Sequence, residues 1–596
     1  MCGIVGLIGS QSGNWINEMN DAQYHRGPDE DGLYSDGDEI SLAMRRLSIM
    51  DIEGGSQPLI SNDRQYVLIY NGEIFNAFDL RFDLEKKGEI FNTNNSDTEL
   101  LFKILQKEGI YSVRKLNGMF SFAFLDKVNN KLFLARDRFG IKPLYYTTQN
   151  GFFAFSSELK SILSLPFIKR DINMQSLFNY LSLSYVNGYD SIIEGIKRLN
   201  PGHILEYDLG RKELKIIRWW EPLFNPNNDL NINNISNEIL DKLQSSIKRW
   251  TISDVDIGAC LSGGLDSSAI VALSHKLGKS IKTFSLGFDD EYAKDLDELP
   301  LARKVALEFG TEHMEIILKP EDILEDLNSM ISSIDEPYAG GLPTWFVFKF
   351  MSKYLKVGLT GTGGDELFGN YGKWCGLEKK LPWIYRTRSK YKITRKVFEN
   401  KFFNKFYYFK NSDKISIIEN MEKQFSNTSD YFYDLFLNSK ASNIRDSIAC
   451  TDWLTQLPDE FLLMNDRFSM AHSLEARTPF LDNELIDLIL KIPSNLRTKQ
   501  KDLKYLLRKT LSGILPDEIL NAKKKGFILP IDRWLRTNLM GLTKEYLDPM
   551  RLKKEGIFNP DIYSRYVLPH FEGKSNNSIK IWTLLMFQLW KENNLR

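Results

Sequence analysis

The chain has few cysteines, no long uncharged apolar run and almost no excess of charge of either sign. Its four cysteines, at positions 2, 260, 375 and 450, are too scattered for a disulfide framework, and no CxxC pair has the spacing of a zinc site. We therefore expect a reducing compartment and a cytoplasmic protein. No uncharged stretch reaches the roughly 18 residues that span a bilayer. The N-terminus has no basic start, which argues against a secretory signal.

The charge balance also narrows the class of partner. With 77 basic and 78 acidic residues, the chain offers no electrostatic footprint for nucleic acid or an anionic membrane, so we expect small-molecule substrates. Single hydrophobic cores rarely grow beyond about 250–300 residues. A chain of 596 residues should therefore hold at least two domains.

The most informative stretch is SGGLDSS at residues 262–268. It follows the apolar residues 257–261, which predict a buried strand, and precedes residues 269–273, which predict the start of a helix that ends near Gly278. Glycines allow a close backbone approach, and the N-terminus of a helix favours a multiply charged anion. The pattern therefore predicts a nucleotide phosphate site made of Leu261, Ser262, Gly263, Gly264, Asp266, Ser267 and Ser268.

This loop lacks the lysine of the GxxxxGK[ST] phosphate motif, so the usual ATPase or GTPase interpretation has no support. Asp266 instead offers a carboxylate to Mg²⁺ beside the phosphates. A glycine-rich turn between two buried elements is the alternative interpretation, and it would be the better one for a bare SGG.

Cys2 has an ordinary interpretation as a small apolar residue that opens a strand. Removal of Met1, however, would leave a thiol and a free α-amine on the same residue. With a reference pKa of about 7.7–8.0, that amine can act as the general base for the thiol. No histidine partner is then required.

Four short motifs follow Cys2 within the first hundred residues: HRGPD at 25–29, RLSIM at 46–50, YNGEI at 70–74 and NSD at 95–97. In this order they resemble the glutaminase domain of the N-terminal-nucleophile amidotransferases. Together with SGGLDSS, they make nearly the whole chain resemble the glutamine-dependent asparagine synthetase family.

The resemblance implies a catalytic centre at Cys2. Its thiol would attack the side-chain amide of glutamine, giving a thioester and ammonia. Asn71 and the N–H group of Gly72 would hold the developing oxyanion, which an Asn-Gly pair on a tight turn can do.

The resemblance also implies a set of glutamine-binding residues. A planar cationic fork suits the α-carboxylate of glutamine, which assigns Arg46, and acidic side chains suit its α-ammonium group, which assigns Glu73 and Asp97. Taken separately, Arg46 and Asp97 would be ordinary surface charges. The complete implied site is Arg46, Leu47, Ser48, Ile49, Asn71, Gly72, Glu73 and Asp97.

The first 220 residues predict a sheet-rich α+β domain. Apolar runs at 119–124 and 131–136 flank a turn at 129–130 and predict paired strands. The resemblance implies an αββα sandwich of the N-terminal-nucleophile type. The polar, turn-forming residues 221–234 predict a linker.

Residues 235–596 predict an α/β domain. Strands expected at 281–286, 313–318 and 357–360 alternate with helices expected at 300–309 and 344–354. This order favours a parallel sheet with helices on both faces and a ligand at the carboxyl ends of the strands, where Leu286 would meet the adenine. The resemblance implies an ATP-pyrophosphatase domain with extra helices. Between 372 and 450 we expect aromatic-rich helices without chemistry.

A second glycine-rich stretch, TGTGGDELFGNY, occupies residues 360–371. By resemblance, Asp365 joins Asp266 in binding Mg²⁺ and pyrophosphate, although a glycine-rich helix cap is the plainer alternative. The remaining implied contacts are Thr360 and Gly361 with the nucleotide, and Lys501 and Lys525 with the departing pyrophosphate. The motifs DRFSMA at 466–471 and SLEARTPFLD at 473–482 also match the family, and their charges suit salt bridges equally well.

Three positions depart from the family pattern, and all lie in the synthetase half. Thr362 stands where an acidic residue tied to formation of the acyl-adenylate is usual, and Met464 stands where lysine is usual. The loop at 335–343, DEPYAGGLP, is shorter and richer in glycine. The changes concern the region where the acceptor should bind.

Three hypotheses follow. The first is a two-site amidotransferase that hydrolyses glutamine at Cys2 and passes ammonia to a carboxylate that ATP has activated as its adenylate, with aspartate as the favoured acceptor. The second keeps this mechanism with another acceptor, such as a uronic acid of a nucleotide sugar used in polysaccharide or O-antigen assembly. The third is a non-catalytic glutamine or nucleotide sensor, which the joint presence of Cys2, Asp97 and Asp266 disfavours. A homodimer is compatible with all three.

Overall fold

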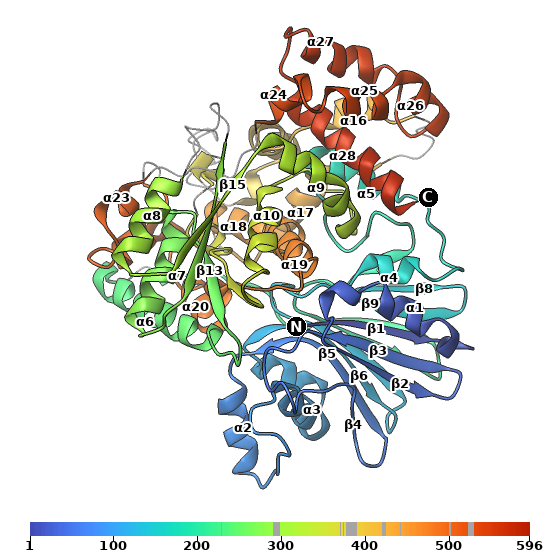
Figure 1. Ribbon diagram of the computed structural model, residues 1–596, viewed down its shortest axis with the longest axis vertical. Helices are drawn as coiled ribbons and strands as arrows, with labels where there is room; N and C mark the ends of the chain where they lie inside the picture. Colours follow the sequence, from blue (N-terminus) through green and yellow to red (C-terminus); the bar gives the residue numbers. More distant parts are fainter. Residues whose placement is uncertain are drawn as a thin grey trace.

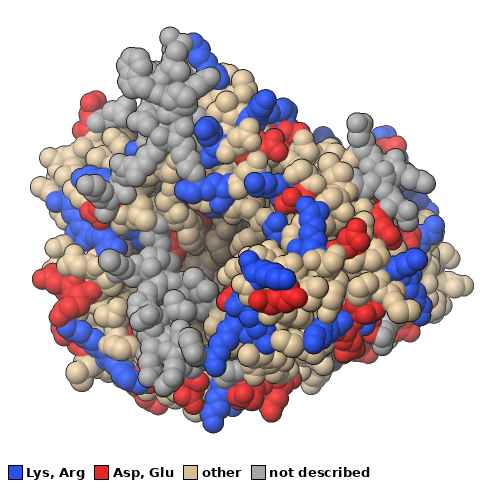
Figure 2. Space-filling model, turned by 90° about the horizontal axis from the view of Figure 1, so that it is seen from above, with Lys and Arg blue, Asp and Glu red and all other residues tan. Residues whose placement is uncertain are grey.

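The computed structural model describes residues 1–227, 229–289, 298–369, 371–373, 375–376, 390–419, 425–441, 443–499, 502–522 and 530–595 (Figure 1). Within these ranges no helix is both long and apolar enough to cross a membrane. All four cysteines lie in these ranges, and none of them forms a disulfide bond. On the face shown in Figure 2, positive and negative side chains are interspersed around a central hollow, as the near-zero net charge leads one to expect.

Two six-stranded antiparallel sheets form the N-terminal half. The first has the order β10-β8-β9-β1-β3-β2 and contains β1 (Cys2–Ile8), β2 (Glu30–Asp36), β3 (Ile40–Arg46), β8 (Tyr145–Gln149), β9 (Phe152–Ser156) and β10 (Ile196–Arg198). The second has the order β12-β11-β7-β6-β5-β4 and contains β4 (Leu59–Ile60), β5 (Tyr66–Ile74), β6 (Gly118–Asp126), β7 (Lys131–Arg136), β11 (His203–Asp208) and β12 (Glu213–Arg218).

Strand β6 shows how the sequence builds these layers. Because side chains alternate across a strand, its aromatic residues Phe120, Phe122 and Phe124 face one side, and Ala123 and Leu125 face the other. The aromatic side packs on the helical layer, and the smaller side joins the core between the two sheets. The predicted strands at 119–124 and 131–136 are confirmed.

Helices cover both outer faces of the paired sheets (Figure 1). Helices α1 (Ile16–Asp21) and α4 (Leu159–Leu163) pack on the first sheet, while α3 (Asp97–Glu108) packs on the second beside α2 (Ala77–Glu85). The arrangement is helix, sheet, sheet, helix. This confirms the predicted αββα sandwich.

The C-terminal half is organised around a five-stranded parallel sheet of order β15-β14-β13-β16-β17. Its strands are β13 (Ile257–Cys260), β14 (Lys282–Phe288), β15 (His313–Leu318), β16 (Val357–Leu359) and β17 (Glu475–Arg477), and the helices between them include α7 (Leu265–Lys276), α8 (Leu299–Glu308) and α10 (Pro343–Met351). The predicted α/β class is confirmed. Strand β17 was not predicted, because its three residues lie in a motif that we interpreted through its charges.

The connection between the halves runs from the end of β12 at Arg218 to helix α6 (Ile232–Trp250). The side chain of Asn231 caps this helix by accepting hydrogen bonds from the N–H groups of Asn233 and Asn234, so the helix begins at Ile232, inside the predicted linker. The domain bounds 1–220, 221–234 and 235–596 stay predictions.

One apolar cluster is shared by both halves. It includes Val5 and Leu7 of β1 as well as Ala259 of β13 and Leu359 of β16, all fully buried. Between the halves, Arg26 forms a two-pronged ion pair with Asp466, with nitrogen–oxygen distances of 2.7 and 3.1 Å. The two halves therefore pack as one molecule with a partly charged interior.

Candidate active sites

The first site surrounds Cys2 at the start of β1. Antiparallel pairing places Arg46 of β3 opposite Cys2, and β5 brings Asn71, Gly72 and Glu73 to the same end of the sandwich. The pocket is lined by Met1, Cys2, Arg46, Leu47, Ile49, Met50, Gly55, Gln57, Tyr70, Gly72, Glu73, Asp97 and Thr98. The structure thus brings together most of the residues predicted to bind glutamine. The N–H group of Ser48 instead donates to Asp29 Oδ2 at 2.8 Å.

Asn71 is held directly against the nucleophile. Its Oδ1 accepts a hydrogen bond from the backbone N–H of Cys2 at 3.1 Å. Its buried Nδ2 has no hydrogen-bond partner among the described residues. Because a buried amide donor without a partner costs free energy, this group is suited to an oxygen that the substrate supplies.

Met1 still precedes Cys2 and occupies part of the pocket. Its α-ammonium group donates to the carbonyl of Leu47 at 3.0 Å and lies 3.5 Å from Glu475 Oε2. Burial raises the pKa of the Cys2 thiol, while the nearby ammonium group opposes that rise. Removal of Met1 would move the free amine onto the backbone nitrogen of Cys2, beside Asn71.

The acidic residues of the pocket are buried and close together. Asp97 begins α3 and accepts hydrogen bonds from the Tyr70 hydroxyl at 2.8 Å and the Ile74 N–H at 3.0 Å. Burial raises the pKa of Glu73 well above its usual range, and the charge of Asp97 raises it further. A bound cation such as an α-ammonium group would relieve this repulsion.

Arg46 lies on the opposite side of the nucleophile. Its guanidinium group donates to the carbonyls of Asp51 at 2.7 Å and Ile52 at 3.0 Å and pairs with Glu30 at 2.8 Å. These contacts hold the fork in place at the edge of the pocket. Gln57 lies beside the thiol, with its Nε2 3.8 Å from Cys2 Sγ, and was not predicted from the sequence.

The second site is a cavity of about 360 Å³ at the carboxyl ends of β13, β14 and β16. Ser262 and Gly263 follow β13 and lead into α7, which begins at Leu265 and not at Ala269 as expected. Asp266 and Ser267 therefore belong to the first helical turn, and Ser268 is buried behind them. Leu286 lines the cavity from β14, and Thr360 and Gly361 line it after β16.

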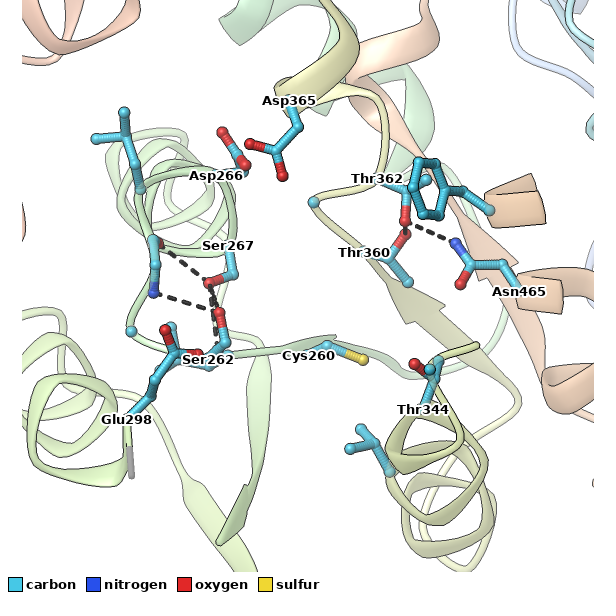
Figure 3. A pocket seen from close by; sticks show the side chains of 18 of the residues that line it. Cys260, Ser262, Asp266, Ser267, Glu298, Thr344, Thr360, Thr362, Asp365 and Asn465 are labelled. Atoms are coloured by element: carbon cyan, nitrogen blue, oxygen red, sulfur yellow. Dashed lines mark hydrogen bonds between the residues drawn. The ribbon is translucent and has the colours of Figure 1, made fainter. Parts of the chain in front are cut away.

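Two short hydroxyl contacts shape this loop. The Oγ atoms of Ser262 and Ser267 lie 3.1 Å apart, and the Ser262 hydroxyl accepts from the Gly264 N–H at 3.2 Å (Figure 3). Gly263 has a φ of +73°, which favours glycine. The phosphate-site residues thus lie together around the N-terminus of α7.

Asp266 and Asp365 face each other at the N-termini of two helices, α7 and α11 (Gly364–Phe368) (Figure 3). The ammonium group of Lys504 forms ion pairs with both carboxylates. Carboxylate oxygens are the ligands that Mg²⁺ prefers, usually with substrate phosphates and water completing the shell. The described residues contain no group of three or more histidine, cysteine or acidic side chains that could hold a metal ion.

Lys504 was missed by the sequence analysis, which selected Lys501 and Lys525 instead. Both predicted lysines lie outside the described residues. The segment contains several lysines, and nothing in their spacing distinguishes Lys504. Its position follows from tertiary packing of the segment before α22 (Tyr505–Thr510) against the two helix N-termini.

The far end of the cavity contains the positions that depart from the family pattern. Thr362 Oγ1 accepts a hydrogen bond from Asn465 Nδ2 at 2.6 Å and one from the Thr360 hydroxyl at 3.2 Å (Figure 3). Met464 lines the same end. Other residues there are Tyr338, Gly341, Glu366, Tyr371, Glu460 and Phe461.

The loop at 335–343 connects this end to the N-terminal half. Glu336 accepts hydrogen bonds from the Tyr145 hydroxyl and the Ile192 N–H, both at 2.9 Å. The hydroxyl of Tyr338 accepts from the Gly341 N–H at 2.8 Å, which folds the glycine pair against the tyrosine ring. The loop therefore forms part of the cavity wall.

Fold and sites together define a glutamine amidotransferase joined to an ATP-dependent synthetase. Residues 1–220 match the glutamine amidotransferase domain family, and residues 238–592 match the asparagine synthase family. The chain is 33% identical to the glutamine-hydrolyzing asparagine synthetase 1 of Bacillus subtilis (strain 168), over 100% of this chain and 97% of that protein. The protein belongs to the glutamine-hydrolysing asparagine synthetase family.

More distant relatives extend the match. Asparagine synthetase 3 of Bacillus subtilis is 30% identical over 90% of each chain. Asparagine synthetase of Cricetulus griseus is 28% identical over 88% of this chain and 84% of that protein. Both are also named as glutamine-hydrolyzing enzymes. Their coverage of this chain shows that the similarity extends over both halves of the molecule.

Proposed function

We propose that the protein makes asparagine from aspartate, with glutamine as the source of ammonia and ATP as the activating substrate. The observation that carries the glutamine-hydrolysing half of this proposal is the buried Asn71 amide, which touches Cys2 and has an Nδ2 donor without a partner among the described residues. That geometry suits an oxyanion next to a thiol nucleophile. The match of residues 238–592 to the asparagine synthase family supports the asparagine-forming half.

At the first site, Cys2 attacks the side-chain carbonyl of glutamine. Its own α-amine, released by loss of Met1, takes the thiol proton and returns it to the leaving ammonia. Asn71 Nδ2 and the Gly72 N–H hold the oxyanion, Arg46 holds the α-carboxylate, and Glu73 with Asp97 holds the α-ammonium group. Water then cleaves the thioester and releases glutamate.

At the second site, an oxygen of the aspartate β-carboxylate attacks the α-phosphorus of ATP. Pyrophosphate leaves, and ammonia then displaces AMP from the acyl carbon to give asparagine. Asp266 and Asp365 would hold Mg²⁺, which shields the charge of the phosphates. Lys504, which pairs with both carboxylates, would turn to the departing pyrophosphate when Mg²⁺ takes its place between them.

The test of the proposed function combines a product assay with one variant. Purified protein is given ATP, Mg²⁺ and glutamine, with and without aspartate, and pyrophosphate and amide products are measured. We expect pyrophosphate release that depends on aspartate, with asparagine as the product. The Cys2→Ala variant should lose glutamine use while ammonium still supports synthesis, and unchanged glutamine hydrolysis in that variant would refute the nucleophile assignment.

A second acceptor class is favoured by one observation: the residues that line the cavity include Thr362 and Met464 together with the aromatic residues Tyr338 and Phe461. The carboxylates and aromatic rings that line this cavity suit the binding of a hydroxyl-rich ring, such as a uronic acid of a nucleotide sugar. Glutamine hydrolysis without any response to aspartate, together with amidation of such a sugar, would favour this acceptor over aspartate. Absence of both activities would favour the sensor hypothesis.

A homodimer and a cytoplasmic location stay predictions. Sedimentation of the purified protein tests the first, and fractionation of cells tests the second.

A further inference from the structure

Arg477 of the synthetase half contacts one lining residue of each active site. Arg477 ends strand β17 and is fully buried. Its guanidinium group lies 3.7 Å from Glu73 Oε2 in the glutamine pocket and also pairs with Glu475. The same group donates to the carbonyls of Trp250 at 2.9 Å and Ile252 at 2.6 Å, so its orientation is fixed.

The backbone of Arg477 is hydrogen-bonded to a residue that lines the ATP cavity. Strand β17 pairs in parallel with β16, and the carbonyl of Arg477 accepts a hydrogen bond from the N–H group of Thr360 at 2.8 Å. Thr360 and Gly361 line that cavity. Arg477 therefore joins a residue of the ATP cavity, through its carbonyl, to Glu73 of the glutamine pocket, through its side chain.

The charge of Arg477 matters to Glu73 because that carboxyl group is buried among other acids. Glu73 is surrounded by Asp97, Glu475, the N-terminal ammonium group and Arg477. Burial and Asp97 raise the pKa of Glu73, whereas Arg477 and the ammonium group oppose this rise. An α-ammonium substrate group needs the ionised form.

We propose that Arg477 is a positioning residue of the glutamine site, supplied by the synthetase half, and that it couples glutamine binding to occupation of the ATP cavity. This inference rests on the proposed role of Glu73 in holding glutamine. Arg477 itself does not touch the reacting atoms. It fixes the position and charge of Glu73.

The main test is Arg477→Lys, which keeps a cation but removes the fork. We expect the KM for glutamine to rise about tenfold with little change in kcat, because binding of the α-ammonium group is weakened in the ground state and transition state alike. Ammonium-dependent asparagine synthesis should be retained. Arg249→Lys is the control. Arg249 lies on the neighbouring helix α6 and pairs with Asp482 at 2.7 Å, so this variant should leave the KM for glutamine unchanged.

A pH profile separates this role from a merely structural one. In Arg477→Gln, which removes the positive charge, Glu73 should ionise only at higher pH, so the KM for glutamine should fall as pH rises, more steeply than in the unaltered protein. A general loosening of the fold would instead lower kcat at both sites, and the dependence of the KM for glutamine on pH would keep its slope. An unchanged KM and profile in a variant that still uses ammonium would overturn the inference and leave the proposed function intact.

The coupling has its own test, which does not depend on altering Arg477. The KM for glutamine is measured with and without ATP, Mg²⁺ and aspartate, in the unaltered protein and in Glu73→Gln. We expect the KM to change on filling the ATP cavity only when Glu73 carries its charge. A response of equal size in Glu73→Gln would overturn the proposed coupling, as would the absence of any response in the unaltered protein.

Discussion

Glu460 illustrates how a single side chain in a substrate cavity can lower stability. It lines the acceptor end of the ATP cavity, and its Oε2 accepts a hydrogen bond from Gln456 Nε2 at 2.7 Å. Burial raises the pKa of this carboxyl from 4.5 to about 7, although the Gln456 contact and the Lys373 charge oppose the rise. The folded protein therefore binds this proton more tightly than the unfolded chain does.

We predict that Glu460→Gln stabilises the protein at high pH. A carboxyl with a raised pKa in the folded state contributes stability below pH 4.5 that is lost as pH rises through about 7. Near pH 8 the variant should gain at most about 3 kcal/mol, reduced by the part of the side chain that faces the cavity, and the gain should shrink toward pH 5. Denaturant unfolding at several pH values measures this. Glu545→Gln, at an exposed position, is the control, and an equal gain there would contradict the explanation.

The sequence could predict which residues gather in a pocket where those residues belong to local motifs. It could not do so where tertiary packing brings distant residues together. Cys2, Glu73 and Asp97 lie in one pocket as expected. Lys504 could not be found, because its partners Asp266 and Asp365 lie more than a hundred residues away in the chain. Arg477 was visible as a charge, but its contact with Glu73 depends on strand β17.

At the level of elements, the main discrepancy is the start of helix α7. The polar residues at 266–268 interrupt the apolar pattern, which moved the predicted start to residue 269, whereas the helix begins at Leu265. Polar residues are favourable in a first turn when they bind a ligand or cap the helix. Hydrophobic periodicity therefore could not predict the start of this helix, because the loop residues in its first turn are polar.

The two glycines before this helix should differ sharply in their tolerance of alanine. Gly263 has a φ of +73°, and a Cβ there would lie 2.7 Å from the backbone nitrogen of Ala302. Gly264 has a φ of −74°, and a Cβ would meet only Ser262 Oγ at 3.1 Å. We expect Gly263→Ala to lower the free energy of unfolding by about 1–3 kcal/mol.

Unfolding in denaturant without nucleotide is the appropriate measurement, since it avoids any effect on substrate binding. Gly264→Ala should cost less than about 1 kcal/mol, because its backbone conformation suits any residue. Equal losses for both variants would show that the close approach to Ala302 is not what requires glycine at position 263.

The whole molecule depends on a charged interface between its halves. Asp466 of helix α19 (Leu463–Met470) pairs with Arg26, whose Nε donates to the carbonyl of Cys2 at 3.2 Å. Arg467, the next residue, pairs with Asp335 at 2.8 Å, and all these side chains are buried. The shared apolar cluster continues on either side of this network. The two halves should therefore unfold together.

We predict that Asp466→Asn lowers the free energy of unfolding of the whole chain by about 3 kcal/mol, because the buried Arg26 loses its two-pronged pair with Asp466 and keeps its pair with Glu158 at 2.9 Å. Asp434→Asn, which removes half of an ion pair that is about half exposed, should cost less than about 1 kcal/mol. Calorimetry should show one transition in each protein, and ATP with Mg²⁺ or glutamine should raise the same midpoint. Two transitions, with each ligand moving only one of them, would show that the halves are energetically independent despite their shared core.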